Sequence, residues 1–430
     1  MNKDKKIKQE FSKKALQALA QGKLNKLDLE VKRAINYDDP QTLMTLGETL
    51  IESGHLVPAE LIFQHLIKIE PQNNGAKIML ADILNENGKT DDALLLLDDV
   101  PDDDDNILSA LTQKADIYQT LGMPEVSESF LKKALQIAPQ QRALIFGMAE
   151  LLYSESKYAA ALKYYEQLIK KGVTDFLNQN LLVRKANCLS FLGQYEQASS
   201  IYNKFNDIVL RDDDLFMKGS VSFELKNYQK SIDSLEVLCQ RTPDYARAYL
   251  ILAQDYEKKE QFVKAYNFAQ KGCEIDNFDL PLLIKFSQLA LKVGHEYQAI
   301  SGFKKVLKSD PDNIIALIYL SNLGLKNNDY NSVVKLLNKK ETLAPQLSWN
   351  LGLAFLNMDQ LNLAAENLLS CFNDLRNNPS YLSDLIALFQ KLNQPKELLS
   401  IMQLYLKLVP TDDKIALAYE NLRNELDLNG

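Results

Sequence analysis

The sequence is poor in the residues from which catalytic and metal centres are most often built. It has only three histidines, His55, His65 and His295, so a histidine-based triad or a zinc site is hard to assemble. It also lacks a phosphate-binding loop and a Gly-x-Gly-x-x-Gly motif, the patterns typical of nucleotide binding. We therefore expect no catalytic residues, no metal and no other cofactor.

Other scarce features bear on the environment of the protein. The four cysteines lie far apart within helical patterns, which predicts buried thiols rather than a disulfide framework. No apolar run approaches the roughly 18–20 residues of a membrane span, and the N-terminal segment MNKDKKIKQEFSKK is charged where a signal peptide is apolar. Glycine and proline number only 16 and 13, which disfavours long flexible linkers. Together these features predict a folded cytoplasmic protein that does not enter a membrane.

Charge is distributed unevenly along the chain, although the net charge is only −8. Residues 1–37 hold 10 Lys/Arg against 4 Asp/Glu, a net charge of +6, whereas residues 38–150 hold 7 against 20, a net charge of −13. An acidic block of this size repels nucleic-acid phosphates and suits a basic partner. The basic segment is a weak patch for nucleic acid, because its charge is spread over two expected helices.

The chain is organised by a repeat of 34 residues. Pro243, Pro311 and Pro345 fall on this period, with Asn277 at the remaining step. Two of these blocks open with Pro-Asp, which suits the first turn of a helix, and each of the two then holds two apolar-periodic runs separated by a polar break. A helix–turn–helix unit at a fixed period predicts a stacked helical array. We expect second helices centred on Ala59, Ala93, Ser127, Ala161, Ala198, Ser231, Ala265, Ala299, Val333, Ala364 and Leu398.

Two steps in this series depart from the period by three residues and should perturb the stack locally. A step of 37 residues spans residues 170–180, and a step of 31 lies near Trp349. Counting a first hairpin, the period yields about twelve units. The expected divisions are a degenerate basic hairpin at 1–37, acidic repeats at 38–172, further repeats at 173–410 and a capping helix at 411–430.

The repeat resembles the tetratricopeptide repeat family, of the bacterial cytosolic type. Its motif is matched by Leu46, Gly47, Ala59, Phe63 and Pro71, and again by Tyr249, Leu252, Ala253, Tyr256 and Ala265 and by Leu283, Phe286, Ala299, Phe303 and Pro311. The resemblance covers nearly all of the chain. It implies an all-α solenoid, a right-handed superhelix of helical hairpins whose first helices line a concave groove for protein or peptide partners.

In the tetratricopeptide repeat family, particular positions of the first helices face the groove. At these positions this chain carries rows of like residues along successive first helices. The acidic row consists of Glu48, Asp82, Asp116 and Glu150, together with Glu52 and Glu86, which lie four residues after Glu48 and Asp82. The amide row is Asn187, Gln254, Gln288 and Asn322, and the lysine row four residues further on is Lys258, Lys292 and Lys326. Residues four apart share a helix face.

The chemistry of the rows suggests which ligands they could bind. The alternative is that these positions are polar only because they face solvent. Stacked carboxylates repel one another, and a basic peptide would relieve the repulsion. Side-chain amides both donate and accept hydrogen bonds, so they can pair with the backbone of an extended peptide. The lysines would add a preference for acidic ligands.

The leading hypothesis is therefore a non-catalytic scaffold that binds proteins or extended peptides in the concave groove. One alternative is a peptide-sensing regulatory protein. Another is an RNA-binding helical repeat, against which the acidic wall argues. Self-association of the basic hairpin with the acidic block is a further hypothesis. A chaperone-tail clamp is not expected, because Met44 and Glu48 stand where that clamp has lysine and asparagine.

Overall fold

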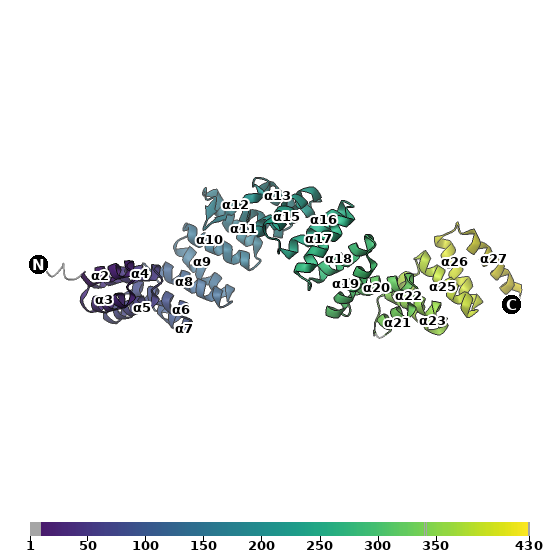
Figure 1. Cartoon of the computed structure of the whole chain (residues 1–430), viewed down its shortest axis with the longest axis horizontal. Coiled ribbons are helices and arrows are strands. Elements are labelled where there is room, and N and C mark those ends of the chain that lie inside the picture. Colours follow the sequence, from purple (N-terminus) through teal and green to yellow (C-terminus); the bar gives the residue numbers. More distant parts are fainter. Residues whose placement is uncertain (1–9, 339, 341, 429–430) are drawn as a thin grey trace. The chain divides into compact units, whose positions relative to one another are not determined.

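The chain is built from successive pairs of antiparallel helices (Figure 1). The computed structural model describes residues 10–338, 340 and 342–428. They belong to two compact units, Met1–Phe205 and Asn206–Gly430, and each unit is an array of its own hairpins.

The first unit contains six hairpins among its described residues. They are α2 (Glu10–Ala20) with α3 (Leu24–Tyr37), α4 (Pro40–Glu52) with α5 (Leu56–Ile69), α6 (Asn74–Glu86) with α7 (Thr90–Asp98), α8 (Ile107–Thr120) with α9 (Pro124–Ile137), α10 (Arg142–Ser154) with α11 (Tyr158–Lys170), and α12 (Leu181–Phe191) with α13 (Tyr195–Tyr202).

The second unit contains six more hairpins, followed by α27 (Asp413–Leu428), which packs against α26. They are α14 (Asp212–Glu224) with α15 (Tyr228–Arg241), α16 (Ala246–Lys258) with α17 (Phe262–Ile275), α18 (Leu280–Lys292) with α19 (Glu296–Ser309), α20 (Ile314–Lys326) with α21 (Tyr330–Leu337), α22 (Pro345–Asn357) with α23 (Leu361–Ser370), and α25 (Pro379–Leu392) with α26 (Pro395–Leu408). The predicted all-α solenoid of about twelve hairpins and a terminal helix is confirmed.

The hairpin of α4 and α5 shows why such a sequence folds in this way. Asp39 caps α4, since its carboxylate accepts a hydrogen bond of 3.1 Å from a backbone N–H of the first turn, and Pro40 begins the helix. Gly54 adopts a φ of +74° in the turn, where glycine carries no steric penalty. A Cβ atom on Gly47 would lie 2.5 Å from the Phe63 ring, so the glycine allows the two helices to pack closely.

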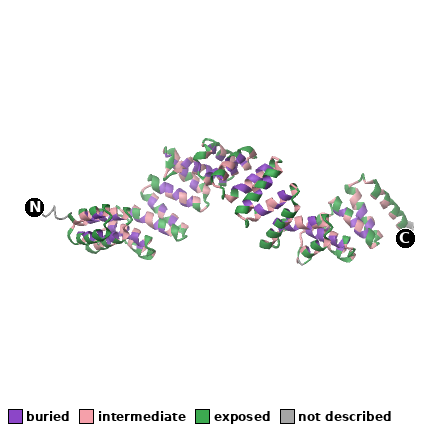
Figure 2. Ribbon diagram, viewed as in Figure 1, coloured by how far each residue is buried: buried purple, intermediate pink, exposed green. Residues whose placement is uncertain are grey.

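The sites predicted for the second helices all lie on second helices and are buried (Figure 2). Leu398 is the most accessible, at 8% exposure, and the others are 0–1% exposed. Most of these residues are small, which allows close approach of helices, and aromatic side chains such as Phe63, Tyr165 and Phe303 are fully buried beside them in the core. Buried hydrophobic residues therefore recur along each array instead of gathering at one centre.

The two irregular steps disturb the array, as predicted. Within the longer step, β1 (Asp175–Phe176) and β2 (Gln179–Asn180) form an antiparallel hairpin. At the shorter step, α21 has only 8 residues, whereas α19 has 14. The short helix α24 (Phe372–Leu375) and the 3-10 turn η1 (Asp207–Val209) were not predicted.

The cysteines are free thiols, and those of Cys188 and Cys371 are buried. Burial raises the pKa of the Cys188 thiol to about 12. Across the described residues, every helix is too short or too polar to cross a bilayer. The expected division of the chain by charge rests on sequence alone and stays a prediction.

Candidate functional site

The acidic row lies on the first helices of four successive hairpins in the first unit. Glu48 is on α4, Asp82 on α6, Asp116 on α8 and Glu150 on α10. Helix α4 contacts α6, and α6 contacts α8. Glu52 and Glu86, at the last residues of α4 and α6, are exposed. The repeat thus places carboxylates at one register of neighbouring first helices.

Asp82 and Asp116 form the electrostatic centre of this row. Neither carboxylate has a hydrogen bond or an ion pair within the part of the chain that the structure describes. Burial raises the pKa of the Asp82 carboxyl. For Asp116, burial raises the pKa first and the charge of Asp82 raises it further. The two groups therefore repel each other across adjacent helices and would both gain from a nearby cation.

Lysines of the same helices do not supply that cation. Lys77 of α6 is buried and pairs with Asp99, and Lys114 of α8 is buried and pairs with Asp98 at 2.7 Å. Both lysines are thus directed to carboxylates at the end of α7 and just beyond it. The sequence analysis did not single out these pairs.

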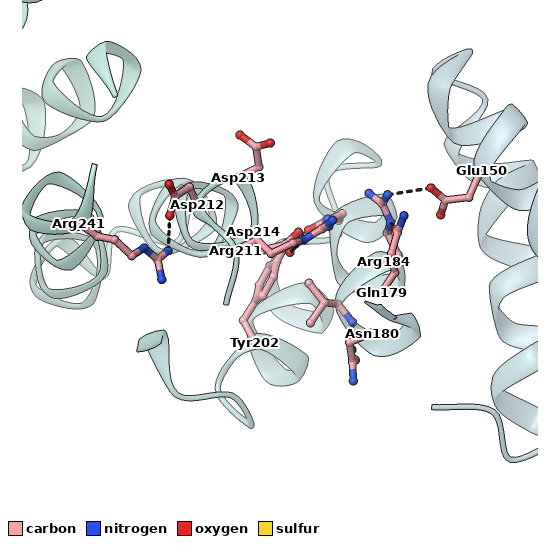
Figure 3. A network of polar contacts seen from close by, with 12 residues as sticks. Glu150, Gln179, Asn180, Arg184, Tyr202, Arg211, Asp212, Asp213, Asp214 and Arg241 are labelled. Carbon is pink, nitrogen blue, oxygen red and sulfur yellow. Dashed lines mark hydrogen bonds and ion pairs between the residues drawn. The ribbon is translucent and has the colours of Figure 1, made fainter. Parts of the chain in front are cut away.

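Glu150 differs from the rest of the acidic row because its carboxylate is already engaged. Figure 3 shows the guanidinium of Arg184, on α12, directed at Glu150 at a distance of 2.7 Å. The hydroxyl of Tyr165 donates a second hydrogen bond to the same carboxylate. The Arg184 guanidinium also lies 4.9 Å from the centre of the Tyr153 ring. Glu150 therefore joins α10, α11 and α12 and does not extend the open part of the row.

The amide row is less uniform than the sequence implied. Asn187 is 2% exposed, and the Tyr202 hydroxyl donates to its side-chain oxygen. The expectation of a groove-facing amide at this position is therefore wrong: the side chain holds α12 against α13. Gln254 on α16 and Gln288 on α18 are half-buried. Asn322 on α20 is exposed and accepts a hydrogen bond of 2.7 Å from Asn350.

Two of the three lysines in the lysine row have carboxylate partners. Lys292 pairs with Glu257 at 2.6 Å and lies 5.0 Å from the Phe262 ring centre. Lys326 lies 3.9 Å from Glu296. Lys258 is exposed and has no ion pair among the described residues. This row is therefore a set of largely compensated surface charges and a weak platform for an acidic ligand.

Acidic segments elsewhere in the chain are used for folding. In the first unit, the Asp104 carboxylate accepts hydrogen bonds from the side chain of Asn74 and the backbone of Asn106, both at 2.7 Å. In the second unit, Asp212 pairs with Arg241 at 2.5 Å, drawn as a dashed line in Figure 3. Clusters of His, Cys, Asp or Glu that could hold a metal ion do not occur within residues 10–338, 340 and 342–428.

Family models of tetratricopeptide repeats match four stretches of the chain. Models described as YpiA-like, tetratricopeptide repeats and YpiA-like, C-terminal tetratricopeptide repeats match residues 119–173 and 345–412. General tetratricopeptide repeat models match residues 50–114 and 180–208. The matches fall in both compact units.

Individual proteins show the same likeness at low identity. The TPR repeat-containing protein YpiA of Bacillus subtilis is 23% identical over 367 residues, which cover 85% of this chain and 86% of the relative. The crystal structure of the APC/C hetero-tetramer Cut9–Hcn1 matches with a TM-score of 0.40 and 14% identity, covering 98% of this chain and 96% of that chain. The crystal structure of YrrB, described as a TPR protein with an unusual peptide-binding site, has a TM-score of 0.37 and 15% identity, covering 44% of this chain and 95% of that chain.

The 34-residue period, the paired helices and their buried small residues agree with these matches. The chain belongs to the tetratricopeptide repeat family.

Proposed function

We propose that the protein is a non-catalytic scaffold whose first unit binds a basic segment of a partner protein along the acidic row. Tetratricopeptide repeat proteins are generally protein-interaction scaffolds. The observation that carries the finer proposal is the Asp82–Asp116 pair, two repelling carboxylates that have no cation within the described residues. A lysine or arginine side chain placed between them would relieve the repulsion.

The segment would lie across α4, α6 and α8, because Glu48, Asp82 and Asp116 occupy one register of these helices. Each exposed charge pair contributes about 0.2–1 kcal/mol, so ion pairing alone gives weak affinity. Its larger effects are to orient the peptide and to accelerate its association. A partner with several basic residues is therefore favoured over one with a single lysine.

The free cysteines suit a reducing compartment, and we place this activity in the cytoplasm. The compensated lysine row does not favour RNA binding. The peptide-sensing and self-association hypotheses gain no observation from the described residues.

A titration with a fluorescent lysine-rich peptide tests the proposal. The full chain should bind it, more weakly as salt is raised, and the Asp82→Asn/Asp116→Asn variant should bind about two- to thirtyfold more weakly. The matched control is Asp102→Asn/Asp103→Asn, which removes the same charge from an exposed loop of the same unit. If both double variants lose affinity equally, binding reflects net charge and the acidic row is not the site.

A further inference from the structure

A groove in the second unit has a lining that includes no residue of the acidic, amide or lysine row. It has a volume of about 630 Å³, and it is lined by second helices α19 and α21 with α20 between them. Helix α21 is short, with 8 residues where α19 has 14. Ligand pockets usually span about 300–1,000 Å³, so the groove can accept several side chains.

The floor of the groove is apolar and only partly covered. Its aliphatic side chains come from all three helices, and they are Ile300, Leu307, Leu320, Leu323 and Leu336. Leu323 is 8% exposed and the other four are half-buried. Gly324 lies at one end of the floor and has no room for a side chain, because a Cβ atom there would lie 2.5 Å from Val333. The groove can therefore bury leucine-sized side chains of a ligand.

The rim of the groove carries more positive than negative charge. Lys304 and Lys308 line it from α19, and Lys335 lines it from α21. All three are exposed, and none has an ion pair in the part of the chain that the structure describes. The single carboxylate in the lining, Asp329, caps α21 by accepting a hydrogen bond of 3.2 Å from the Ser332 backbone. It offsets only part of the lysine charge.

We propose that this groove is a second docking site, for an acidic amphipathic helix of a partner protein. Such a helix would place leucine-like side chains on the aliphatic floor and Asp or Glu side chains beside the lysine rim. The commitment to an acidic occupant follows from the three lysines, which outnumber the one carboxylate of the lining and have no ion pair among the described residues. The commitment to a helix follows from a lining made by three helices, because helices commonly bind in grooves between helices by apolar residues at i, i+3, i+4 and i+7. The site is independent of the acidic row, which selects the opposite charge.

The test is a fluorescence-anisotropy titration of the full chain with two synthetic helical peptides. Both carry leucine at i, i+3, i+4 and i+7, and they differ only in having glutamate or lysine at the flanking positions. The glutamate peptide should bind, and Lys304→Glu/Lys335→Glu should weaken it about tenfold or more. Ser332→Trp, which fills the groove from an exposed position, should also abolish binding. Circular dichroism confirms that each variant is folded.

Matched variants separate this site from net charge and from the acidic row. Lys230→Glu/Lys305→Glu makes the same charge change at exposed residues that do not line the groove, and it should leave the affinity unchanged. Asp82→Asn/Asp116→Asn should also leave it unchanged. The proposal is overturned if both peptides bind alike at this groove, if the two lysine double variants behave identically, or if the glutamate peptide does not bind.

Discussion

Asp255 offers a direct test of the packing between α15 and α16. Its side chain is fully buried on α16, and neither carboxyl oxygen has a hydrogen-bond partner among the described residues. Burial raises its pKa from 3.8 to about 7, and the nearby Ser231 hydroxyl and Lys259 ammonium offset only part of this effect. We expect Asp255→Asn to stabilise this region, but only at pH values where the native aspartate is ionised.

The magnitude follows from the linkage between pKa and stability. The folded protein holds the proton more tightly than the unfolded chain, so stability falls as pH rises from about 4 to about 7 and is then constant. A shift of about three pKa units corresponds to about 4 kcal/mol, an upper figure because water can enter when the array opens locally. The variant should therefore gain up to about 4 kcal/mol at pH 8 and little at pH 4.

Native-state hydrogen exchange is the suitable assay, because long repeat arrays do not unfold in one step. Amides of α15 and α16 should become more protected in Asp255→Asn than in the native chain at pH 8, with a smaller difference at pH 5. Asp244→Asn, at an exposed loop position, is the control and should change the protection of these amides at neither pH. A gain that is the same at pH 5 and pH 8, or a loss of protection at pH 8, would refute the reasoning.

Four further variants test contacts in the first unit. Gly47→Ala should lower the free energy of local opening in native-state hydrogen exchange by about 1–3 kcal/mol, because its Cβ would enter the facing ring. Gly147→Ala, at a helical site with open space, should raise this free energy by up to about 1 kcal/mol. Arg184→Gln should cost about 1–3 kcal/mol in the same assay, because its partly buried carboxylate partner loses a charged donor. Asp82→Asn should lower the pKa of Asp116 toward its ordinary value, followed by carboxyl NMR titration, and should raise stability at pH 7 but not at pH 3. An unchanged Asp116 titration would show that the two carboxylates do not interact.

The repeat, its packing sites and its irregular steps could be predicted because each hairpin packs its two helices in the same way, with the same kinds of residue at the same positions. Ala59 and Ala265 are buried for the same reason, namely close approach of two helices, and a period of 34 makes that reason visible in sequence. An inserted segment occurs once in the chain, so no repeated pattern indicates its structure. The period therefore indicated where residues 170–180 depart from the array but not that they form a β-hairpin.

The candidate site was predicted only in part, because a shared register does not reveal the neighbours of a side chain. Glu150 holds the same position as Asp82, yet Arg184 engages it from the next first helix. That arginine follows Glu150 by 34 residues, so a search for opposite charges one period apart could have found the pair. Asn187 is buried because Tyr202 donates to it, a contact that depends on side-chain geometry within one hairpin.

Hydrogen exchange of the full chain with and without a saturating lysine-rich peptide tests the proposed binding surface most directly. We expect added protection in α4, α6 and α8, which carry Glu48, Asp82 and Asp116, and no change in the second unit. Protection confined to second helices, or protection in α4, α6 and α8 that persists in the Asp82→Asn/Asp116→Asn variant, would contradict a cation-binding role for the acidic row.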